Sequence, residues 1–373
     1  MLSTYVSYQL IVRDMPKAID RVEREPMVDR ETKYYLENIS KVKTIDEFVK
    51  DDRLFRYAMK AHGLEDMAYA KAFMVKALKE GISDPDSFAN KLSDKRYAEF
   101  VGTYNFAKHG ELATVYNKAQ HEVPGNYLMQ AEIAGLDPES EYVQQETAYY
   151  RANIGKVTSI EALMSNERLL TYAMAAYGLD GTTEDLDYIE ELLAGGVRDP
   201  KSPANVEEDK RYTGFVAAFD FEALGDKATT LTRAQQPSID KYLRQTLEEN
   251  AGEENEGVRL ALYFERKAAG ITSFYEILAD PALAEVVRTA LSLPDSFASA
   301  DIDQQVKFFE SKLDIEDFTD PERLGKFLTR FTSMWEVNNP TAPAQAQISV
   351  LFSQPVEFGI STDTLFAIQS MKR

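Results

Sequence analysis

Cysteine is absent from this chain of 373 residues. Disulfide bridges, thiolate metal sites and a cysteine nucleophile are therefore excluded. Histidine is scarce, because only His62, His109 and His121 occur, and none of the spacings of a metal site is present. Three unrelated histidines are more often surface residues than ligands. We therefore expect them on the surface, and we expect neither a metal nor another cofactor.

Positive charge is also in short supply. The chain has 42 Lys and Arg against 62 Asp and Glu, which gives a formal charge of 42 − 62 = −20. Such a balance repels phosphate backbones and anionic membrane surfaces, so we expect no nucleic acid partner unless basic residues gather on one face. No uncharged apolar run approaches the roughly 18 residues of a membrane span, and the N-terminus lacks the basic start of a secretory signal. We expect no membrane span.

Signatures of catalysis and nucleotide binding are missing as well. The sequence has no GxGxxG, P-loop, GxSxG or HExxH motif. The stretch Asp301-Ile302-Asp303 begins like a calcium loop, but it lacks the glycine at the sixth position and the terminal glutamate. The sequence therefore predicts that the protein is not an enzyme.

The strongest feature that is present is a duplication. Roughly 32 of about 80 positions between residues 31 and 110 recur, identical and without a gap, at a distance of 146 − 31 = 115 residues. The retained stretches include Glu31-Thr32, Asn38-Ile39, Lys41-Val42, Arg53-Leu54, Tyr57-Ala58-Met59 and Asp94-Lys95-Arg96-Tyr97. A match of this length indicates a tandem repeat.

Helical signals run through both copies, and strand signals are almost absent. Apolar residues recur at i, i+4 from Leu54 to Ala61, and Gly63 follows as a helix stop. Thr44 stands where an N-cap belongs, before a first turn that contains acidic residues. We predict an all-α fold of tandem helical repeat units of about 115 residues in series, in which each unit covers an apolar face of its neighbour.

A third, diverged copy follows an acidic stretch at 248–257, which we expect to be a loop. It keeps the apolar pattern and loses the polar signature. Glycine-bearing segments near 136 and 250 mark the predicted boundaries. The predicted parts are a first helical unit with an N-terminal arm at 1–135, a second unit at 136–250, the diverged third unit at 251–338 and a C-terminal tail at 339–373.

The polar residues shared by the copies allow two interpretations: a duplicated ligand site, or the caps and ion pairs that duplicated folds share. We favour the second, because Asp84 and Asp94 stand where caps belong. The tyrosine pairs Tyr34-Tyr35 and Tyr149-Tyr150 could form a stacking platform, but aromatic residues at helical spacing are more typical of a protein core. The candidates for contact with a ligand or partner are these tyrosine pairs and two lysines at a helix end: Tyr34, Tyr35, Lys41, Tyr149, Tyr150 and Lys156.

The C-terminal tail carries more apolar side chains than can remain in water. We predict a docking strand and helix from about 345 to 373, bound to the chain's own units or to a partner. Burying even half of its apolar groups would contribute several kcal/mol at about 25 cal/mol per Å2. The candidate contact residues in this segment are Phe358, Leu365 and Phe366.

The stretches retained in both copies of the repeat resemble an uncharacterised bacterial family. The pattern Glu-Thr-x-Tyr-Tyr-x-x-Asn-Ile-x-Lys-Val, followed by Arg-Leu-x-x-Tyr-Ala-Met-x-Ala-x-Gly-Leu, is similar to a domain of unknown function whose members often carry tandem copies. The resemblance covers about 25–110 and 140–225. Members are often encoded beside flagellar rod and basal-body genes, so the resemblance implies a motility role. It implies no catalytic residues.

We therefore expect a non-enzymatic structural or protein-interaction role, associated with flagellum assembly or motility. The expected partner is a protein, with a flagellar component as one candidate. The alternative is a module that binds a small ligand in a pocket between helical units, lined by Tyr34, Tyr35 and Lys41 or their equivalents. The expected location is cytoplasmic, with export through the flagellar apparatus without a cleavable signal as the alternative. The oligomeric state stays open.

Overall fold

The computed structural model describes residues 3–181, 183–199 and 201–339, and these residues form helices and turns without a strand. The predicted all-α fold is confirmed. The described residues divide into two compact units, one of 15–250 and the other of 3–14 with 251–339. In the described part of the chain, no helix has both the length and the apolar character that a bilayer crossing demands.

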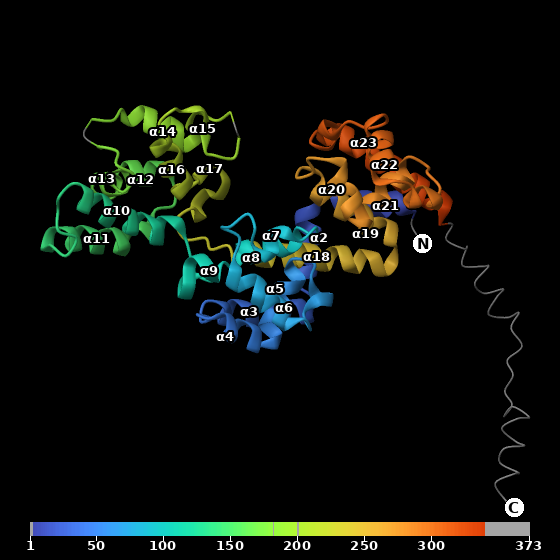
Figure 1. The fold of residues 1–373 in the computed structure, drawn as a ribbon, viewed down its shortest axis with the longest axis horizontal. Coiled ribbons are helices and arrows are strands. Elements are labelled where there is room, and N and C mark those ends of the chain that lie inside the picture. Colours follow the sequence, from blue (N-terminus) through green and yellow to red (C-terminus); the bar gives the residue numbers. More distant parts are fainter. Residues whose placement is uncertain (1–2, 182, 200, 340–373) are drawn as a thin grey trace, which may run out of the picture. The chain divides into compact units, whose positions relative to one another are not determined.

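The first copy is a series of short helices (Figure 1). Its elements are α2 (Met15–Glu23), α3 (Pro26–Ile39), α4 (Ile45–Lys50), α5 (Asp52–Ala61), η1 (Glu65–Met67), α6 (Lys71–Glu80), α7 (Phe88–Lys91), α8 (Arg96–Thr103), α9 (Phe106–His109) and η2 (Gly110–Leu112). Local signals set these limits. Thr44 and Glu47 form a reciprocal capping box at the start of α4. Gly63, with a φ of +66°, follows the end of α5 in a left-handed conformation that favours glycine.

The second copy repeats this order. Its elements are η3 (Lys118–Glu122), α10 (Val123–Ile133), α11 (Glu141–Asn153), η4 (Ile154–Lys156), α12 (Ile160–Met164), α13 (Glu167–Ala175), α14 (Leu186–Gly195), α15 (Pro203–Val206), α16 (Lys210–Phe219), α17 (Phe221–Leu224) and η5 (Gly225–Lys227). The cap repeats too, because the Ser159 hydroxyl accepts from the Ala162 N–H at the start of α12. The same local signals therefore produce the same helices twice.

The third copy keeps the order of helices although its polar residues have changed. After α18 (Gln236–Glu254), its elements are α19 (Glu256–Ala268), α20 (Phe274–Ala279), α21 (Pro281–Ala290), η6 (Asp295–Ser299), α22 (Ile302–Glu310), η7 (Ile315–Phe318) and α23 (Pro321–Asn338). Adding 114 to the first residues of α12 and α13, 160 and 167, gives 274 and 281, the first residues of α20 and α21. The diverged third copy is thus visible in the helices themselves.

The acidic stretch that we expected to be a loop is largely helical. Helix α18 continues to Glu254, and α19 begins at Glu256. Glu248 is buried and pairs with Arg244 at 3.1 Å, so this charge lies inside the fold and not in a solvated loop. Gly252 permits a close approach, because a Cβ there would lie 2.8 Å from Cδ of Arg259. The loop prediction for 248–257 was wrong because contacts far along the chain hold this helix, as Glu249 pairs with Lys60 and Asn250 bonds Glu25.

The N-terminal segment also differs from the expectation. We assigned it to the first copy, but α1 (Thr4–Val12) contacts α19 and α23. The N–H and the hydroxyl of Thr4 donate to Oε2 of Glu336 at 2.7 and 2.6 Å, and the Asn255 side chain donates to the Thr4 hydroxyl at 2.9 Å. These contacts join residues up to 332 positions apart, so no local pattern announces them.

The two helices that complete the first and second copies come from equivalent places in the sequence, because Ala119-Gln120 and Tyr127-Leu128 recur as Ala234-Gln235 and Tyr242-Leu243. We call α10 and α18 the closing helices. Helix α10 packs on α11 and α13, directly after it in the chain. Helix α18 instead lies on the first copy (Figure 1), far before it in the chain. The two copies are thus closed alike but by different routes of the chain.

Candidate functional site

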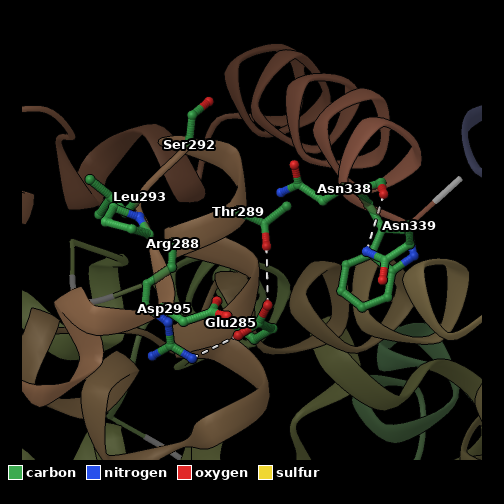
Figure 2. A pocket seen from close by; sticks show the side chains of 10 residues that line it. Glu285, Arg288, Thr289, Ser292, Leu293, Asp295, Asn338 and Asn339 are labelled. Atoms are coloured by element: carbon green, nitrogen blue, oxygen red, sulfur yellow. Dashed lines mark hydrogen bonds and ion pairs between the residues drawn. The ribbon is translucent and has the colours of Figure 1, made fainter.

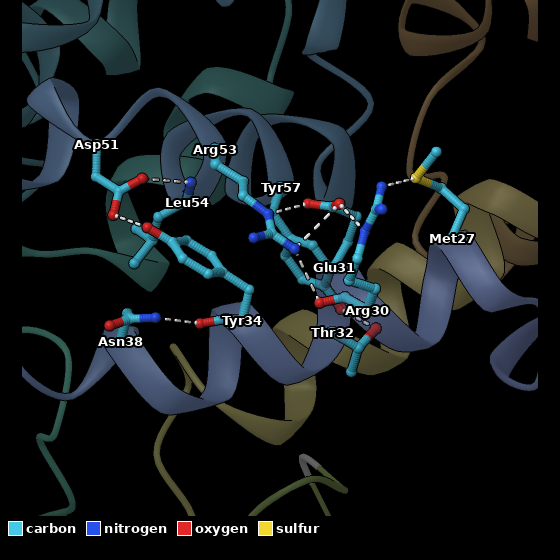
Figure 3. A network of polar contacts seen from close by, with 10 residues as sticks. All are labelled: Met27, Arg30, Glu31, Thr32, Tyr34, Asn38, Asp51, Arg53, Leu54 and Tyr57. Carbon is cyan, nitrogen blue, oxygen red and sulfur yellow. Dashed lines mark hydrogen bonds and ion pairs between the residues drawn. The ribbon is translucent and has the colours of Figure 1, made fainter.

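Tyr34 belongs to a polar cluster that ties α3 to the start of α5 (Figure 3). Its hydroxyl donates to Asp51 at 2.7 Å, and this hydrogen bond is the main cause of its raised pKa. The Arg53 guanidinium lies 4.0 Å from the centre of the Tyr34 ring and pairs with Glu31 at 2.6 Å. Asp51 also accepts from the Leu54 N–H at 3.0 Å, which caps α5. The polar atoms of this cluster serve the contact between two helices and the cap of α5.

The second copy repeats this cluster around Tyr149. The hydroxyl of Tyr149 lies 3.5 Å from Oδ1 of Asn166, the residue that caps α13. Arg168 lies 3.8 Å from the ring centre and donates to Glu146 at 2.9 Å from both Nε and Nη2. In the third copy Tyr263 makes the same bond, to the capping Asp280 at 2.6 Å. The cluster therefore follows the helical architecture.

Tyr35 and Tyr150 point into the interior, away from their neighbours Tyr34 and Tyr149. Both are 0% exposed, and burial raises their pKa well above the ordinary value of a tyrosine. The Tyr35 hydroxyl donates to the carbonyl of Ala234 at 2.6 Å, and the Tyr150 hydroxyl donates to the carbonyl of Ala119 at 2.9 Å. The two hydroxyls therefore anchor the start of the closing helices.

Lys41 and Lys156 are exposed and stay beside the helix ends from which they project. Lys41 donates to the side-chain oxygen of Asn38 at 3.2 Å, and Lys156 donates to that of Asn153 at 3.0 Å. Asn38 in turn donates to the carbonyl of Tyr34 at 2.8 Å. The predicted tyrosines and lysines therefore do not converge: one tyrosine of each pair is interior, the other joins two helices, and the lysine attends a helix end.

The shared Asp-Lys-Arg stretch closes a loop. Asp94 accepts from the Arg96 N–H at 3.0 Å and binds the Arg96 guanidinium, with Nη2 and Oδ2 2.7 Å apart. The same guanidinium donates to the carbonyl of Gly63, the residue after the end of α5. Asp209 and Arg211 repeat each of these bonds in the second copy. This ion pair is thus a structural link between the start of one helix and the end of another.

Among the described residues of the third copy, side chains line two cavities. The larger, about 660 Å3, lies between the ends of α21 and α23 (Figure 2). Within it Glu285 accepts from the Arg288 guanidinium at 2.7 Å and from the Thr289 hydroxyl at 3.2 Å, so the arginine is neutralised by its neighbour. The other, about 480 Å3, is lined by residues of α20 and α22 and the segment after α22. Neither cavity is lined by a sequence-predicted candidate.

The histidines correct one expectation. His62 is only 6% exposed and lies edge-on to Phe100, with ring centres 5.5 Å apart. His109 is half-buried and stacks on Tyr116 at 3.6 Å, and burial lowers its pKa. The expectation of three surface histidines was therefore wrong. Across the described ranges, no group of three or more His, Cys, Asp or Glu side chains is placed to hold a metal ion.

The sequence reasoning missed the residues that join α18 to the first copy. Tyr242 stacks on Tyr57 with ring centres 3.8 Å apart, and Lys60 pairs with Glu249 at 2.6 Å. Burial is the largest single influence and disfavours the Lys60 ammonium ion, but the bond to Glu249 and the charge of Glu249, with smaller contributions from Tyr242 and Glu65, together outweigh it, so the pKa of Lys60 is raised. A signal was available, since the equivalent positions 175 and 134 are both alanine. Opposite charges at both positions in one pairing, with alanine at both positions in the other, indicate that the two residues are in contact.

The remaining candidates, Phe358, Leu365 and Phe366, lie outside the described residues, and so does the predicted docking segment from about 345 to 373.

A family model described as a protein of unknown function (DUF1217) matches residues 61–188 and 176–324. The two matches begin 176 − 61 = 115 residues apart, which is the repeat length. The second match continues through the third copy to residue 324, although the polar signature has been lost there.

The crystal structure of protein AGR_C_984 from Agrobacterium tumefaciens is similar to this chain. The two share 36% sequence identity, the match covers 91% of this chain and 98% of that one, and the TM-score is 0.55. Among curated proteins, none matches this sequence.

Proposed function

The chain belongs to the DUF1217 family of proteins of unknown function, and we propose that it is a non-enzymatic structural protein that acts by binding other proteins in flagellum assembly or motility. The observation that carries this proposal is how the repeated polar side chains are used. The described members of the shared set act as helix caps, ion pairs and loop closures. A ligand site would need such side chains to converge on a cavity.

Exposed apolar side chains on the second copy support a role in protein binding. Met129, Ile133, Leu136 and Tyr142 are 52, 71, 46 and 61% exposed, and they lie on α10, on α11 and between them. At the places of Met129 and Ile133, the other closing helix has the buried ion pair of Arg244 and Glu248. Exposed apolar residues that gather on contacting helices are typical of a surface that another protein covers.

The flagellar part of the proposal rests on the resemblance to a family often encoded beside flagellar genes. A deletion strain tests it directly. We expect loss of swimming or of filaments in soft agar and by electron microscopy, with recovery when the full chain is supplied again. A strain that swims normally and carries normal filaments would contradict the motility role.

Variants in the complementing chain separate binding from folding. Ile133→Asp with Tyr142→Asp places charge on the exposed apolar surface and should fail to restore swimming at an unchanged melting temperature. Asp209→Ala removes the cap of α16, and Asp94→Ala removes the bonds to the Arg96 N–H and guanidinium; each should cost about 1 kcal/mol and restore swimming fully. If either variant lost activity at unchanged stability, the structural interpretation of the shared polar residues would be wrong.

A further inference from the structure

The first copy is completed by a helix that reaches it out of sequence order. Helix α10 closes the second copy, to which it is joined by the short segment 134–140. Helix α18 stands in the equivalent place before the third copy, yet it closes the first. The first copy and α18 are therefore complementary surfaces that the chain does not hold together by a direct, short connection.

The interface between α18 and the first copy is extensive and specific. Besides the Tyr35 and Lys60 contacts already described, the Tyr104 hydroxyl donates to the Ser238 hydroxyl at 3.1 Å. At the other end of the helix, the Asn250 side chain donates to Glu25 at 3.0 Å. Tyr35 and Tyr104 are both fully buried, so a first copy without α18 would leave their hydroxyls and apolar rings exposed to water. The fold of the first copy therefore requires an α18 helix packed on it.

We propose that the partner of this site, beyond the chain's own α18, is the α18 of a second copy of the same chain, so that the protein self-associates by exchanging this helix. The proposal deepens the protein-interaction role proposed above and rests on it. All contacts of α18 are equally available within one chain and between two. The segment 228–235, which leads from the second copy into α18, has to take another course and gives up the bonds that its carbonyls accept from Asn117. The third copy follows α18 directly after Asn255 and moves with the helix.

The α18 of the same chain and the α18 of a second molecule compete for the same surface of the first copy. The second copy and the segment 228–235 hold α18 near its own first copy, so a second molecule has to compete with this high local concentration of the helix. Exchange therefore grows with chain concentration, and unfolding followed by refolding at high concentration removes the kinetic barrier. The same exchange is disfavoured for α10, because seven residues at 134–140 join it directly to the helix on which it packs.

The ion pair of Lys60 and Glu249 offers a test on the unaltered chain. Chains labelled with 15N are mixed with unlabelled chains, unfolded, refolded together at high concentration and treated with a carbodiimide. This reagent converts a lysine and a carboxylate in contact into an amide. The Lys60–Glu249 pair, 2.6 Å apart, crosses the interface, whereas the Lys71–Asp52 pair, 3.1 Å apart, lies within the first copy and is the control. Mass spectrometry then reads the isotopes of each cross-linked peptide.

We expect mixed-isotope Lys60–Glu249 peptides in the dimeric fraction, and unmixed Lys71–Asp52 peptides in every fraction. Glu249→Gln should abolish the first product and keep the second. Three results would overturn the proposal. The Lys60–Glu249 product could remain unmixed at every concentration. Both products could mix equally, which would mean non-specific association. The control product could form alone, which would mean that α18 does not close the first copy.

The proposal and the broader protein-interaction role can fail separately. An unmixed Lys60–Glu249 product with normal complementation by the full chain would remove helix exchange and keep the role in motility. Mixed isotopes together with a deletion strain that swims normally would keep self-association and remove the motility role.

Discussion

The first two copies and the third copy solve the same packing problem in different ways. The first two are each completed by a closing helix whose start is anchored by a buried tyrosine hydroxyl. In the third copy, α23 is 18 residues long and contacts α19 and α21 directly. Helix α1 also packs there, against both α19 and α23. The equivalent α16 has only 10 residues. A lengthened helix of the copy itself thus takes over part of the role of the closing helix.

This difference explains why the polar signature disappears from the third copy. Tyr263 makes the bond to a capping residue that Tyr34 and Tyr149 make, and in each case the partner lies 17 positions further on. The next residue is therefore Phe264, where the other copies have Tyr35 and Tyr150. Phe264 is buried against Phe318 and Phe327, with ring centres 5.2 and 5.1 Å away. A buried hydroxyl needs an acceptor, and the described neighbours of Phe264 are the apolar rings of Phe318 and Phe327, so phenylalanine is the better residue there.

The largest expected effect comes from removing an aromatic anchor of a closing helix. Tyr242→Ala should lower the free energy of unfolding of the first copy by about 3–5 kcal/mol, because a buried ring stacked on Tyr57 is replaced by a cavity. The fluorescence of Trp335, the single tryptophan, reports on the third copy, and its unfolding transition should stay unchanged. Hydrogen exchange in α3 and α5 should rise. Tyr127→Ala is the matched change in the second copy, where α11 and α13 should respond instead. Equal destabilisation of the third copy by either variant would contradict the comparison.

The next largest effect is expected at alkaline pH, which should destabilise the first two copies before the third. Burial raises the pKa of Tyr104 and Tyr172 to about 12, and it raises the pKa of Tyr35 and Tyr150 as well. Because the folded pKa exceeds the unfolded value of about 10, the contribution to stability is complete below about pH 10 and is lost as pH rises through the folded pKa. Phe264 does not titrate.

Far-UV circular dichroism and tyrosinate absorbance should therefore show cooperative loss of the first two copies between about pH 10 and about pH 12, before Trp335 fluorescence changes. A Trp335 transition at the same or lower pH would show that the tyrosine anchors do not set the difference.

The smallest effect tests the choice between tyrosine and phenylalanine itself. Phe264→Tyr should cost about 1–3 kcal/mol, since it buries a hydroxyl where the other copies supply a backbone carbonyl as acceptor. Tyr35→Phe and Tyr150→Phe should each cost about 1 kcal/mol, because each loses one hydrogen bond to a closing helix. Urea unfolding of the three variants measures the order. A neutral Phe264→Tyr would mean that the third copy also offers an acceptor for a hydroxyl.

Local chemistry was readable from the sequence. Thr44 caps α4 as its position before an acidic turn predicted, and Asp209 caps α16. The predicted caps Asp84 and Asp94 were wrong, because α7 and α8 begin later and have Ser87 and Lys95 as their N-caps. The 115-residue repeat, the all-α fold and the diverged third copy follow from periodicity that each copy carries within itself. For the candidate site, helical spacing favoured a core place for both tyrosine pairs, which is confirmed for Tyr35 and Tyr150, while Tyr34 and Tyr149 are only half-buried. Neighbouring residues of a helix point in different directions, so one member of each pair faces the core.

Only the tertiary structure decided which helix completes which copy. The closing helices α10 and α18 carry nearly the same signals, yet one packs on the copy after it and the other on a copy far before it. Tertiary contacts also decided three other features: the place of α1 on the third copy, the burial of His62 and the helical course of 248–254. The sequence by itself determined the helices, their caps and their apolar faces, because these depend on neighbours along the chain. Pairing of faces depends on contacts between residues hundreds of positions apart, and several faces of similar chemistry were available to each helix.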